Sequence, residues 1–397
     1  MSLRRKLAII ALVYVVEGFP MGIFLDVLFV FLARLGVSKA EIGFVAGLSI
    51  AWSMKVLWSP LIDRFGERRQ WIAGALIVMA GALLVIGRSE ADHITALLWG
   101  ALATFCLASA TQDIAIDAYT IGLVDRGEEG PANAMRNTAY RIGMIGVANS
   151  LLFLPRWIGW QETLAVGAGF AALMAGAVFI VPRVETPPVA LRDTWGALRR
   201  WLSQGGAWPV FLFVLLYRVG DSAMAPMVKP FWVDRGFTNE EIGAISGMLG
   251  GGATIAGAWL AAGVVTRLGI GRALLAMGVL ALASNLAYAT AAHFPETGRA
   301  GVYAASLIES FCSGMAGVAF MSFLMRICQK QHAAVQYALL TAVYNLAGSV
   351  LRIPSGVLTE QLGYAGYFAL TAAFALPAFA FLPGARAWIE RGGRAGG

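Results

Sequence analysis

Twelve long apolar stretches, each close to the length of a membrane-crossing helix, dominate this sequence. A spanning helix needs about 20 mostly apolar residues, because no water is present in the lipid to satisfy exposed backbone groups. The chain is 58% hydrophobic and 13% charged, whereas an average soluble domain has roughly 25% charged residues. A soluble all-α protein of this length could not bury so many apolar residues. The sequence therefore predicts an all-α integral membrane protein with spans near 7–33, 41–61, 70–88, 94–118, 134–154, 163–182, 208–233, 240–265, 272–292, 300–324, 334–354 and 362–383.

The basic residues outside these spans are unevenly distributed between the two sides of the membrane. If the N-terminus is cytoplasmic, most of them fall in inner segments, which is the positive-inside pattern. The outer segments then hold only Arg34, Lys39, Arg88, Arg156, Arg235 and Arg299. We therefore expect a multi-pass protein of the bacterial inner membrane with both termini in the cytoplasm. The net charge of +7 needs no nucleic-acid partner, since no basic stripe with interleaved aromatic residues is present.

A polar stretch divides the sequence into two halves. Residues 183–206 are expected to form a cytoplasmic linker between a six-helix half at 1–182 and another at 207–397. An internal repeat supports this division, because residues 38–47 match residues 238–247 at the start of the second helix of each half. Ser38 with Glu41, and Thr238 with Glu241, have the spacing of a capping box. A charged glycine turn also follows this helix in both halves, at 63–69 and 266–272.

Two six-helix halves with this loop resemble the major facilitator superfamily. The resemblance implies a monomeric secondary transporter whose halves rock around a solute site near the middle of the membrane. We expect small-molecule solutes, protons and the lipid bilayer as partners. Cys106, Cys312 and Cys328 have no metal-ligand spacing, and we find no nucleophile triad or nucleotide-binding loop. No cofactor, no metal and no enzymatic activity are expected.

Charged residues inside the predicted spans are the candidate functional residues, because a charge in a membrane helix is costly and usually faces the protein interior. The bases are Lys55, Arg136, Arg141, Arg218, Lys229 and Arg352, and the acids are Glu17, Asp26, Asp113, Asp117, Asp221 and Glu309. At a rise of about 1.5 Å per residue, Glu17, Arg218, Asp221 and Glu309 fall in a central layer. Lys55, Asp113, Asp117, Arg136 and Arg141 fall toward the inner side, and Asp26, Lys229 and Arg352 toward the outer side.

The central layer is expected to line the solute cavity. Arg218 and Asp221 are three residues apart, so they share a helix face, and an arginine offers a forked donor to carboxylate or phosphate groups. A carboxyl group in a cavity of low dielectric can carry a proton. The candidates for proton coupling are Glu17, Asp113, Asp117 and Glu309. The candidates for substrate binding are Glu17, Gln112, Arg141, Arg218, Asp221, Tyr344 and Asn345. The alternative is that these charges only pair with one another to hold helices together.

The inner and outer charges are candidates for gates that open and close during transport. Asp113 or Asp117 could pair with Arg136 or Arg141. The pair would be either an inner gate or a static ion pair in the hairpin formed by the spans at 94–118 and 134–154. Asp26 could pair with Lys229 or Arg352 on the outer side. The full set of gating candidates is Lys55, Asp63, Arg64, Arg68, Arg136, Asp26, Lys229 and Arg352.

Three segments together resemble one branch of this superfamily. They are Lys55-Val-Leu-Trp-Ser-Pro-Leu-Ile-Asp63, Ala110-Thr-Gln-Asp-Ile-Ala-Ile-Asp-Ala-Tyr119 and Tyr140-Arg-Ile-Gly-Met144. They look like AmpG muropeptide permeases and the related acetyl-coenzyme A transporters. The resemblance implies proton-driven import of a bulky anionic or zwitterionic solute, an N-acetylglucosamine–anhydro-muramyl peptide in the AmpG case. Typical AmpG proteins are longer and have more than twelve helices, whereas shorter members of the branch include siderophore permeases.

Other functions remain as alternatives to muropeptide import. A siderophore or an acyl-coenzyme A ester would be cargo of the same branch. A drug/proton antiporter is less favoured, since efflux pumps of this superfamily usually have apolar cavities. A membrane receptor would be expected to carry a sizeable extramembrane domain, and an integral membrane enzyme would need a reactive cluster.

Overall fold

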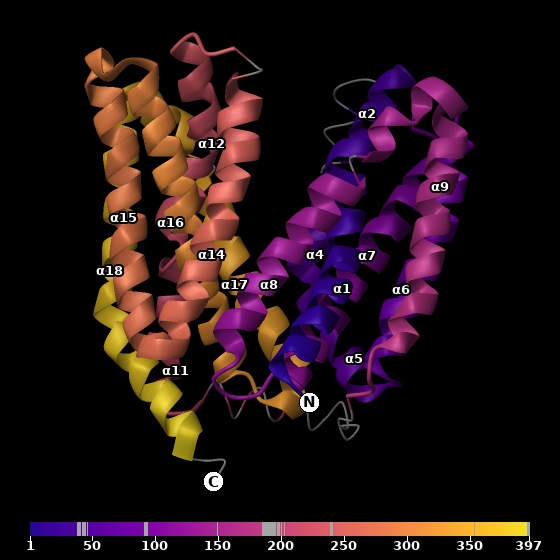
Figure 1. Cartoon of the computed structure of the whole chain (residues 1–397), viewed down its shortest axis with the longest axis horizontal. Helices are drawn as coiled ribbons and strands as arrows, with labels where there is room; N and C mark the ends of the chain where they lie inside the picture. The colour runs from indigo at the N-terminus through magenta and orange to yellow at the C-terminus, as the bar shows by residue number, and fades with distance from the viewer. Residues whose placement is uncertain are drawn as a thin grey trace. The chain divides into compact units, whose positions relative to one another are not determined.

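The computed structural model describes residues 1–37, 41, 45, 47–90, 94–148, 150–184, 196, 199, 201, 203–238, 241–352 and 354–394. Regular structure in this part of the chain is helical throughout (Figure 1). The α-helices up to residue 184 are α1 (Leu3–Gly22), α2 (Leu28–Arg34), α4 (Ile50–Met54), α5 (Ser59–Arg64), α6 (Arg68–Gly87), α7 (Ala96–Leu123), α8 (Glu129–Arg141) and α9 (Pro155–Ala177). The later ones are α11 (Ala207–Leu216), α12 (Val219–Asp234), α14 (Gly250–Leu268), α15 (Ile270–His293), α16 (Gly298–Ile327), α17 (Ala333–Arg352) and α18 (Ser355–Arg394).

The predicted membrane helices are present, although two of them are interrupted. Among the described residues, 10 helical segments are long and apolar enough to cross a membrane, and they coincide with ten of the twelve predicted spans. The span predicted at 41–61 contains α4, a 3₁₀ turn at Lys55–Leu57 and α5. The span predicted at 134–154 contains the end of α8 and a π-helical segment at Ile142–Ala148.

The helix starts follow from local sequence. Glu67 and Gln70 form a capping box at α6, in which the Glu67 N–H donates to Gln70 Oε1 at 3.0 Å. Thr238 and Glu241 form the capping box predicted for the second half, with N–H to side-chain distances of 2.8 and 3.2 Å. The matching prediction at Ser38 lies outside the described residues.

The described chain forms two compact units. Unit 1 contains residues 1–124, 135–198 and 328–342, and unit 2 contains residues 125–134, 199–327 and 343–397. The helices α8 and α17 therefore each run from one unit into the other. Most of the predicted linker 183–206 lies outside the described residues, and the boundaries 1–182 and 207–397 stay a prediction.

In unit 1, α1 and the π-helical segment Ile142–Ala148 pack with their backbones in contact. A methyl group on Gly18 would clash with the Tyr140 carbonyl oxygen, one on Gly22 with the Met144 carbonyl and one on Gly143 with Val15. Small residues allow membrane helices to approach this closely. The contact fixes the face of α1 that carries Glu17.

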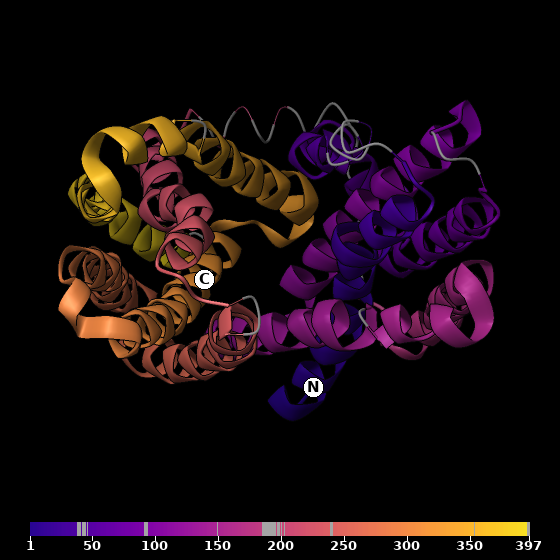
Figure 2. The same cartoon turned by 90° about the horizontal axis from the view of Figure 1, so that it is seen from above.

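In unit 2, α14, α15, α16 and α18 lie side by side, and α18 also packs against α11 and α12 (Figures 1 and 2). A cluster of buried aromatic side chains from α12, α15 and α18 forms the core near one end, including Phe231, Trp232, Tyr288 and Phe368. The path of α11 into α12 breaks at Arg218, whose φ and ψ are −107° and 8°. This break sets the Arg218 side chain at the start of α12.

Candidate functional site

Three carboxylates from α1 and α7 meet in the interior of unit 1. One oxygen atom each from Glu17, Asp113 and Asp117 lies within 4.8 Å of the other two. Asp113 and Asp117 share a face of α7 because they are four residues apart. The close packing of the helix that follows α8 against α1 holds Glu17 toward this face. Glu17 is 6% exposed and Asp117 is 3% exposed, so both carboxyl groups are removed from solvent.

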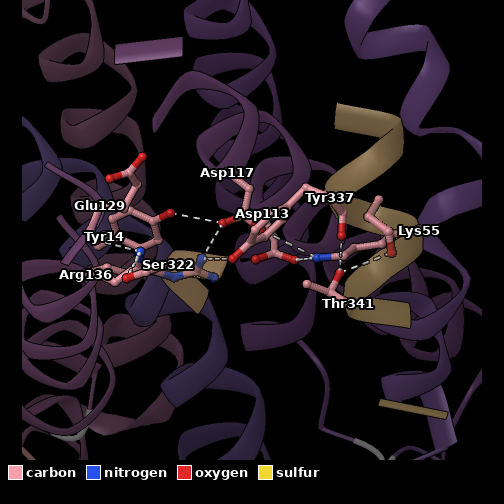
Figure 3. Close-up of polar contacts among 11 residues, drawn as sticks. Tyr14, Lys55, Asp113, Asp117, Glu129, Arg136, Ser322, Tyr337 and Thr341 are labelled. Carbon is pink, nitrogen blue, oxygen red and sulfur yellow. Dashed lines mark hydrogen bonds and ion pairs between the residues drawn. The ribbon is translucent and has the colours of Figure 1, made fainter. Parts of the chain in front are cut away.

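Two cations reach the same carboxylates from other elements. Lys55, on the turn after α4, contacts Asp113 and lies 3.8 Å from Asp117 Oδ2. Arg136 of α8 lies with Nη1 3.0 Å from Asp117 Oδ1. Lys55 approaches from one side of the acids and Arg136 from the other (Figure 3).

Two tyrosines complete the surroundings of Arg136. The Tyr14 hydroxyl donates to Asp117 Oδ1 at 3.0 Å. The Arg136 guanidinium donates to the Tyr337 hydroxyl at 2.5 Å and lies 4.9 Å from the centre of the Tyr14 ring. A guanidinium over an aromatic face is stabilised by the charge distribution of the ring. Asp117 is thus held by three partners, namely Tyr14, Arg136 and Lys55.

The acids outnumber the cations in this cluster, which has three carboxylates, from Glu17, Asp113 and Asp117, but only Lys55 and Arg136 as bases. One carboxylate oxygen of Glu17 lies within 4.8 Å of one from Asp113, and Glu17 Oε2 is buried with no hydrogen-bond partner among the described residues. Two buried carboxyl groups this close together disfavour a state in which both are ionised, so a proton on one of them is stabilising. The cluster is therefore built to hold one proton in addition to its two cations.

Depth counted along each predicted span gave Glu17 a central layer and gave Asp113, Asp117, Lys55 and Arg136 an inner layer. That separation is wrong, because the structure joins all five in one cluster. Counting residues along each span treats every helix as straight and parallel to its neighbours. Side chains reach several ångströms beyond their own Cα positions, and broken or tilted helices do not keep a common depth.

Gln112 lies beside the cluster, whereas Arg141 makes a separate contact. Gln112 Nε2 donates to the Val16 carbonyl at 3.1 Å, so it ties α7 to α1 next to Glu17. Its Oε1 is buried with no hydrogen-bond partner among the described residues. Arg141 Nε lies 3.4 Å from Asn137 Oδ1 on its own helix. The predicted pairing of Asp113 or Asp117 with Arg136 or Arg141 is therefore made by Asp117 of α7 with Arg136 of α8.

The Asp63 carboxylate accepts hydrogen bonds from the first turn of α17. The Ala334 and Val335 N–H groups donate to it at 3.3 and 3.2 Å, and Arg68 Nη2 lies 3.6 Å away. Free N–H groups at a helix N-terminus favour a negative partner. Burial raises the pKa of Asp63 to about 6, although Arg68 and the two N–H groups act in the opposite direction. Arg64 is exposed and stacks on Phe65 instead.

Arg68 is the most highly connected of the predicted gating residues. Besides Asp63, its Nη1 donates to the Ala118 carbonyl at 2.8 Å and its Nη2 donates to the Lys330 carbonyl at 3.2 Å. The side chain is buried. It therefore joins α5, the last turns of α7 and the 3₁₀ turn Lys330–His332 before α17 within unit 1.

Unit 2 contains the second group of predicted site residues. Arg218 Nε lies 3.2 Å from Asp221 Oδ2, as the spacing of three residues predicted. The same guanidinium donates to the Ser313 carbonyl at 2.9 Å and to its hydroxyl at 3.0 Å. Glu309 lies one helical turn before Ser313 on α16. Tyr344, whose ring centre is 5.4 Å from that of Phe320, is half-buried, and Asn345 is exposed.

The residues of the predicted outer gate belong to different units, so the contacts within each unit do not test their pairing. Lys229 donates to the Ser246 hydroxyl at 2.6 Å and Arg352 donates to the Ser222 carbonyl at 3.2 Å, both inside unit 2. Asp26 belongs to unit 1, in the π-helical segment Ile23–Val27. Its pairing with Lys229 or Arg352 stays a prediction.

Sequence reasoning missed two contributions. Tyr14 was not proposed as a site residue, although it lies three residues before Glu17 and so shares its helix face. Glu129 forms a two-pronged ion pair with Arg326 in unit 2, with Nη2 2.8 Å from Oε2. Since 197 residues separate these partners, no local pattern indicates that they meet.

Long apolar helices that enclose buried, paired charges define the class of the protein, a multi-pass membrane transporter, because such charges mark solute or proton pathways. The chain belongs to the Major Facilitator Superfamily, whose family model matches residues 10–351, and within it to the AmpG branch. A relative from Escherichia coli (strain K12), an anhydromuropeptide permease, is 30% identical over 96% of this chain and 80% of its own length. A Rickettsia conorii relative that carries the name AmpG 4 is 28% identical over 93% of both chains.

The fold is shared with distant solved structures. The crystal structure of the human organic anion transporter MFSD10 has a TM-score of 0.73 to this chain at 15% identity, and it covers 96% of this chain and 100% of its own. Its membership of the Major Facilitator Superfamily makes the chain a transporter of small-molecule solutes, and its relatives are permeases rather than enzymes.

Proposed function

We propose that this protein imports anhydromuropeptides into the cytoplasm in symport with protons. It would act as a monomer in the bacterial inner membrane, with both termini in the cytoplasm. The cargo is suggested by the relative that is an anhydromuropeptide permease. The orientation is suggested by the excess of basic residues in the segments assigned to the inner side.

Proton coupling rests on the cluster of three carboxylates and two cations in unit 1. Fully ionised, Glu17, Asp113 and Asp117 would leave one negative charge uncompensated in a buried site, which is strongly unfavourable. A proton between Glu17 and Asp113 balances the cluster. The excess of one carboxylate over the cations is the single observation that carries the proposal, because an exchangeable proton would then lie beside Lys55 and Arg136.

The same cluster gives a simple route from proton movement to conformational change. Lys55 contacts Asp113, so moving the shared proton onto Asp113 removes the negative charge that holds Lys55. Lys55 is then free to move to Asp117 or to a carboxylate of the cargo. The ion pairs of Arg136 with Asp117 and of Arg68 with Asp63 would then open and close as gates.

The cargo carries carboxylates and sugar hydroxyl groups, which match the predicted substrate-binding residues. Arg218 already forms a forked set of bonds with Asp221 and Ser313, so a cargo carboxylate can replace these partners. Gln112 and Tyr344 would bind hydroxyl or amide groups. Glu309, one turn from Ser313, is the second candidate for a proton-carrying residue.

Uptake of labelled anhydromuropeptide into proteoliposomes tests the proposal. We expect accumulation only when the lumen is alkaline relative to the outside, and we expect Arg218→Ala to abolish it. Arg267→Ala, at an exposed arginine in the last turn of α14, is the matched control and should transport normally. If correctly inserted protein takes up no anhydromuropeptide, this cargo is wrong. The same assay would then be repeated with ferric siderophores and coenzyme A esters.

A further inference from the structure

A cavity with charged residues in its lining lies in unit 2. It has a volume of about 480 Å³. The end of α14, the first turn of α15, the end of α16 and the last turns of α18 line it, together with the start of α8. Its charged lining residues are Glu129, Arg272, Arg326, Arg386 and Glu390.

One arginine of this cavity is held in place by the backbone. Arg386 Nε donates to the Gly271 carbonyl at 2.9 Å. A methyl group on Gly271 would lie 2.9 Å from Arg386 Cγ, so only glycine lets the arginine stem lie this close. Among the described residues, the Arg386 Nη groups have no hydrogen-bond partner. Its free donors are therefore fixed beside the first turn of α15.

The charges of the cavity do not cancel. Glu129 is already matched by Arg326 through two contacts. Arg272 and Arg386 then face Glu390 alone, and within the described part of the chain none of these three has an ion pair. The N–H groups in the first turn of α15 add a partial positive charge, since they have no acceptor inside the helix. The cavity therefore favours an anion.

The residues around the charges indicate what kind of anion fits. Arg272 and Arg386 offer planar donors of the kind that bind phosphate oxygens in pairs. Leu268 and Ile389 give the same cavity an apolar side. The cavity lies where several apolar helices end, so it is at the level of lipid headgroups. Basic pockets between membrane helices on the cytoplasmic side bind anionic headgroups.

We propose that this cavity binds a phosphate group, with Arg272 and Arg386 as its ligands. The phosphate can come from an anionic phospholipid or from a soluble phosphate. The site is independent of the transported cargo and of the proton cluster.

Binding is measured with the full chain in nanodiscs of phosphatidylcholine. The lipid arm titrates fluorescent phosphatidylglycerol, and the soluble arm titrates inorganic phosphate against the bound fluorescent lipid. We expect Arg386→Gln and Arg272→Gln each to weaken phosphatidylglycerol binding about fivefold, since a basic residue at the membrane surface contributes about 1 kcal/mol. Arg267→Gln is the control, because this arginine is exposed in the same region but does not line the cavity.

A second pair of variants tests the cavity without removing a charge. Gly271→Ala should displace Arg386 and weaken binding, whereas Gly263→Ala should not, since no atom lies within 4 Å of a methyl group there. If millimolar phosphate displaces the bound lipid, the site is assigned to soluble phosphate. If the lipid binds and phosphate does not displace it, the site is assigned to a lipid headgroup. Equal affinities for wild type, Arg272→Gln and Arg386→Gln overturn the proposal. An equal loss in Arg267→Gln also overturns it, because that result means diffuse surface attraction.

Discussion

Arg136 lies 3.0 Å from Asp117 through Nη1 and Oδ1, and Asp117 Oδ1 also accepts the Tyr14 hydroxyl at 3.0 Å. The two residues come from α8 and α7, which the short segment after Leu123 connects. Both side chains are largely buried, with 18% and 3% of their surface exposed. This ion pair therefore contributes to holding the two helices together. It involves the same carboxylate, that of Asp117, which lies 3.8 Å from Lys55.

Asp117→Asn is expected to destabilise the protein, because it leaves Arg136 buried without its negative partner. Removing one member of a buried ion pair costs about 3–5 kcal/mol. We expect a clear drop in the thermal unfolding midpoint in detergent. The double variant Asp117→Asn/Arg136→Gln should recover most of this loss, since no uncompensated charge remains. Glu296→Gln, at an exposed acid, should leave the midpoint unchanged. If the double variant is no more stable than Asp117→Asn, the pair does not act as a unit.

Glu17→Gln should separate solute movement from proton movement. Glutamine keeps the size of the side chain but cannot carry the shared proton. We expect gradient-driven accumulation of solute to disappear, while exchange of labelled for unlabelled solute across the membrane continues. Both are measured in the same proteoliposomes, with Glu360→Gln at an exposed position as the control. Accumulation that persists in Glu17→Gln would remove Glu17 from the coupling mechanism.

Sequence reasoning predicted the helices well because hydropathy is local. Ten of the predicted spans contain a long apolar window, so their position follows from composition alone. The pair of Arg136 with an acid of α7 was also within reach, because the two helices are neighbours in the chain. The Arg218–Asp221 pair follows from the spacing of three residues on one helix.

The charge cluster as a whole could not be predicted, because it depends on the rotation and tilt of helices. Glu17 and Asp113 are far apart in the sequence, and the packing of α1 against α7 brings them together. The contact of Asp63 with the start of α17 spans more than 270 residues. Periodicity fixes which residues share a helix face, but it does not indicate which other helix that face meets.

Gly143→Ala should damage unit 1, although alanine normally stabilises a helix by up to about 1 kcal/mol relative to glycine. A methyl group at residue 143 would clash with the Val15 backbone, and backbone atoms cannot move aside as a side-chain end can. We expect a loss of about 1–3 kcal/mol, as for other overpacked sites. Gly146→Ala is the matched control, because its nearest neighbour is the Ile142 side chain at 3.9 Å. Thermal unfolding of the two variants gives the comparison, and equal midpoints would contradict the close packing of α1.

Asp63 should make stability depend on pH between about 4 and 6. Its pKa is raised from 3.8 to about 6 in the folded chain, so in this window the folded state binds a proton that the unfolded state has lost. The free energy of unfolding therefore falls as the pH rises, and the fall ends above pH 6. A shift of this size corresponds to about 3 kcal/mol. Thermal unfolding from pH 4 to pH 7 should show a steeper decline for wild type than for Asp63→Asn, which has no proton to exchange. Parallel curves for the two proteins would show that Asp63 titrates at its ordinary pKa, and that burial is offset fully by Arg68 and the N–H groups of α17.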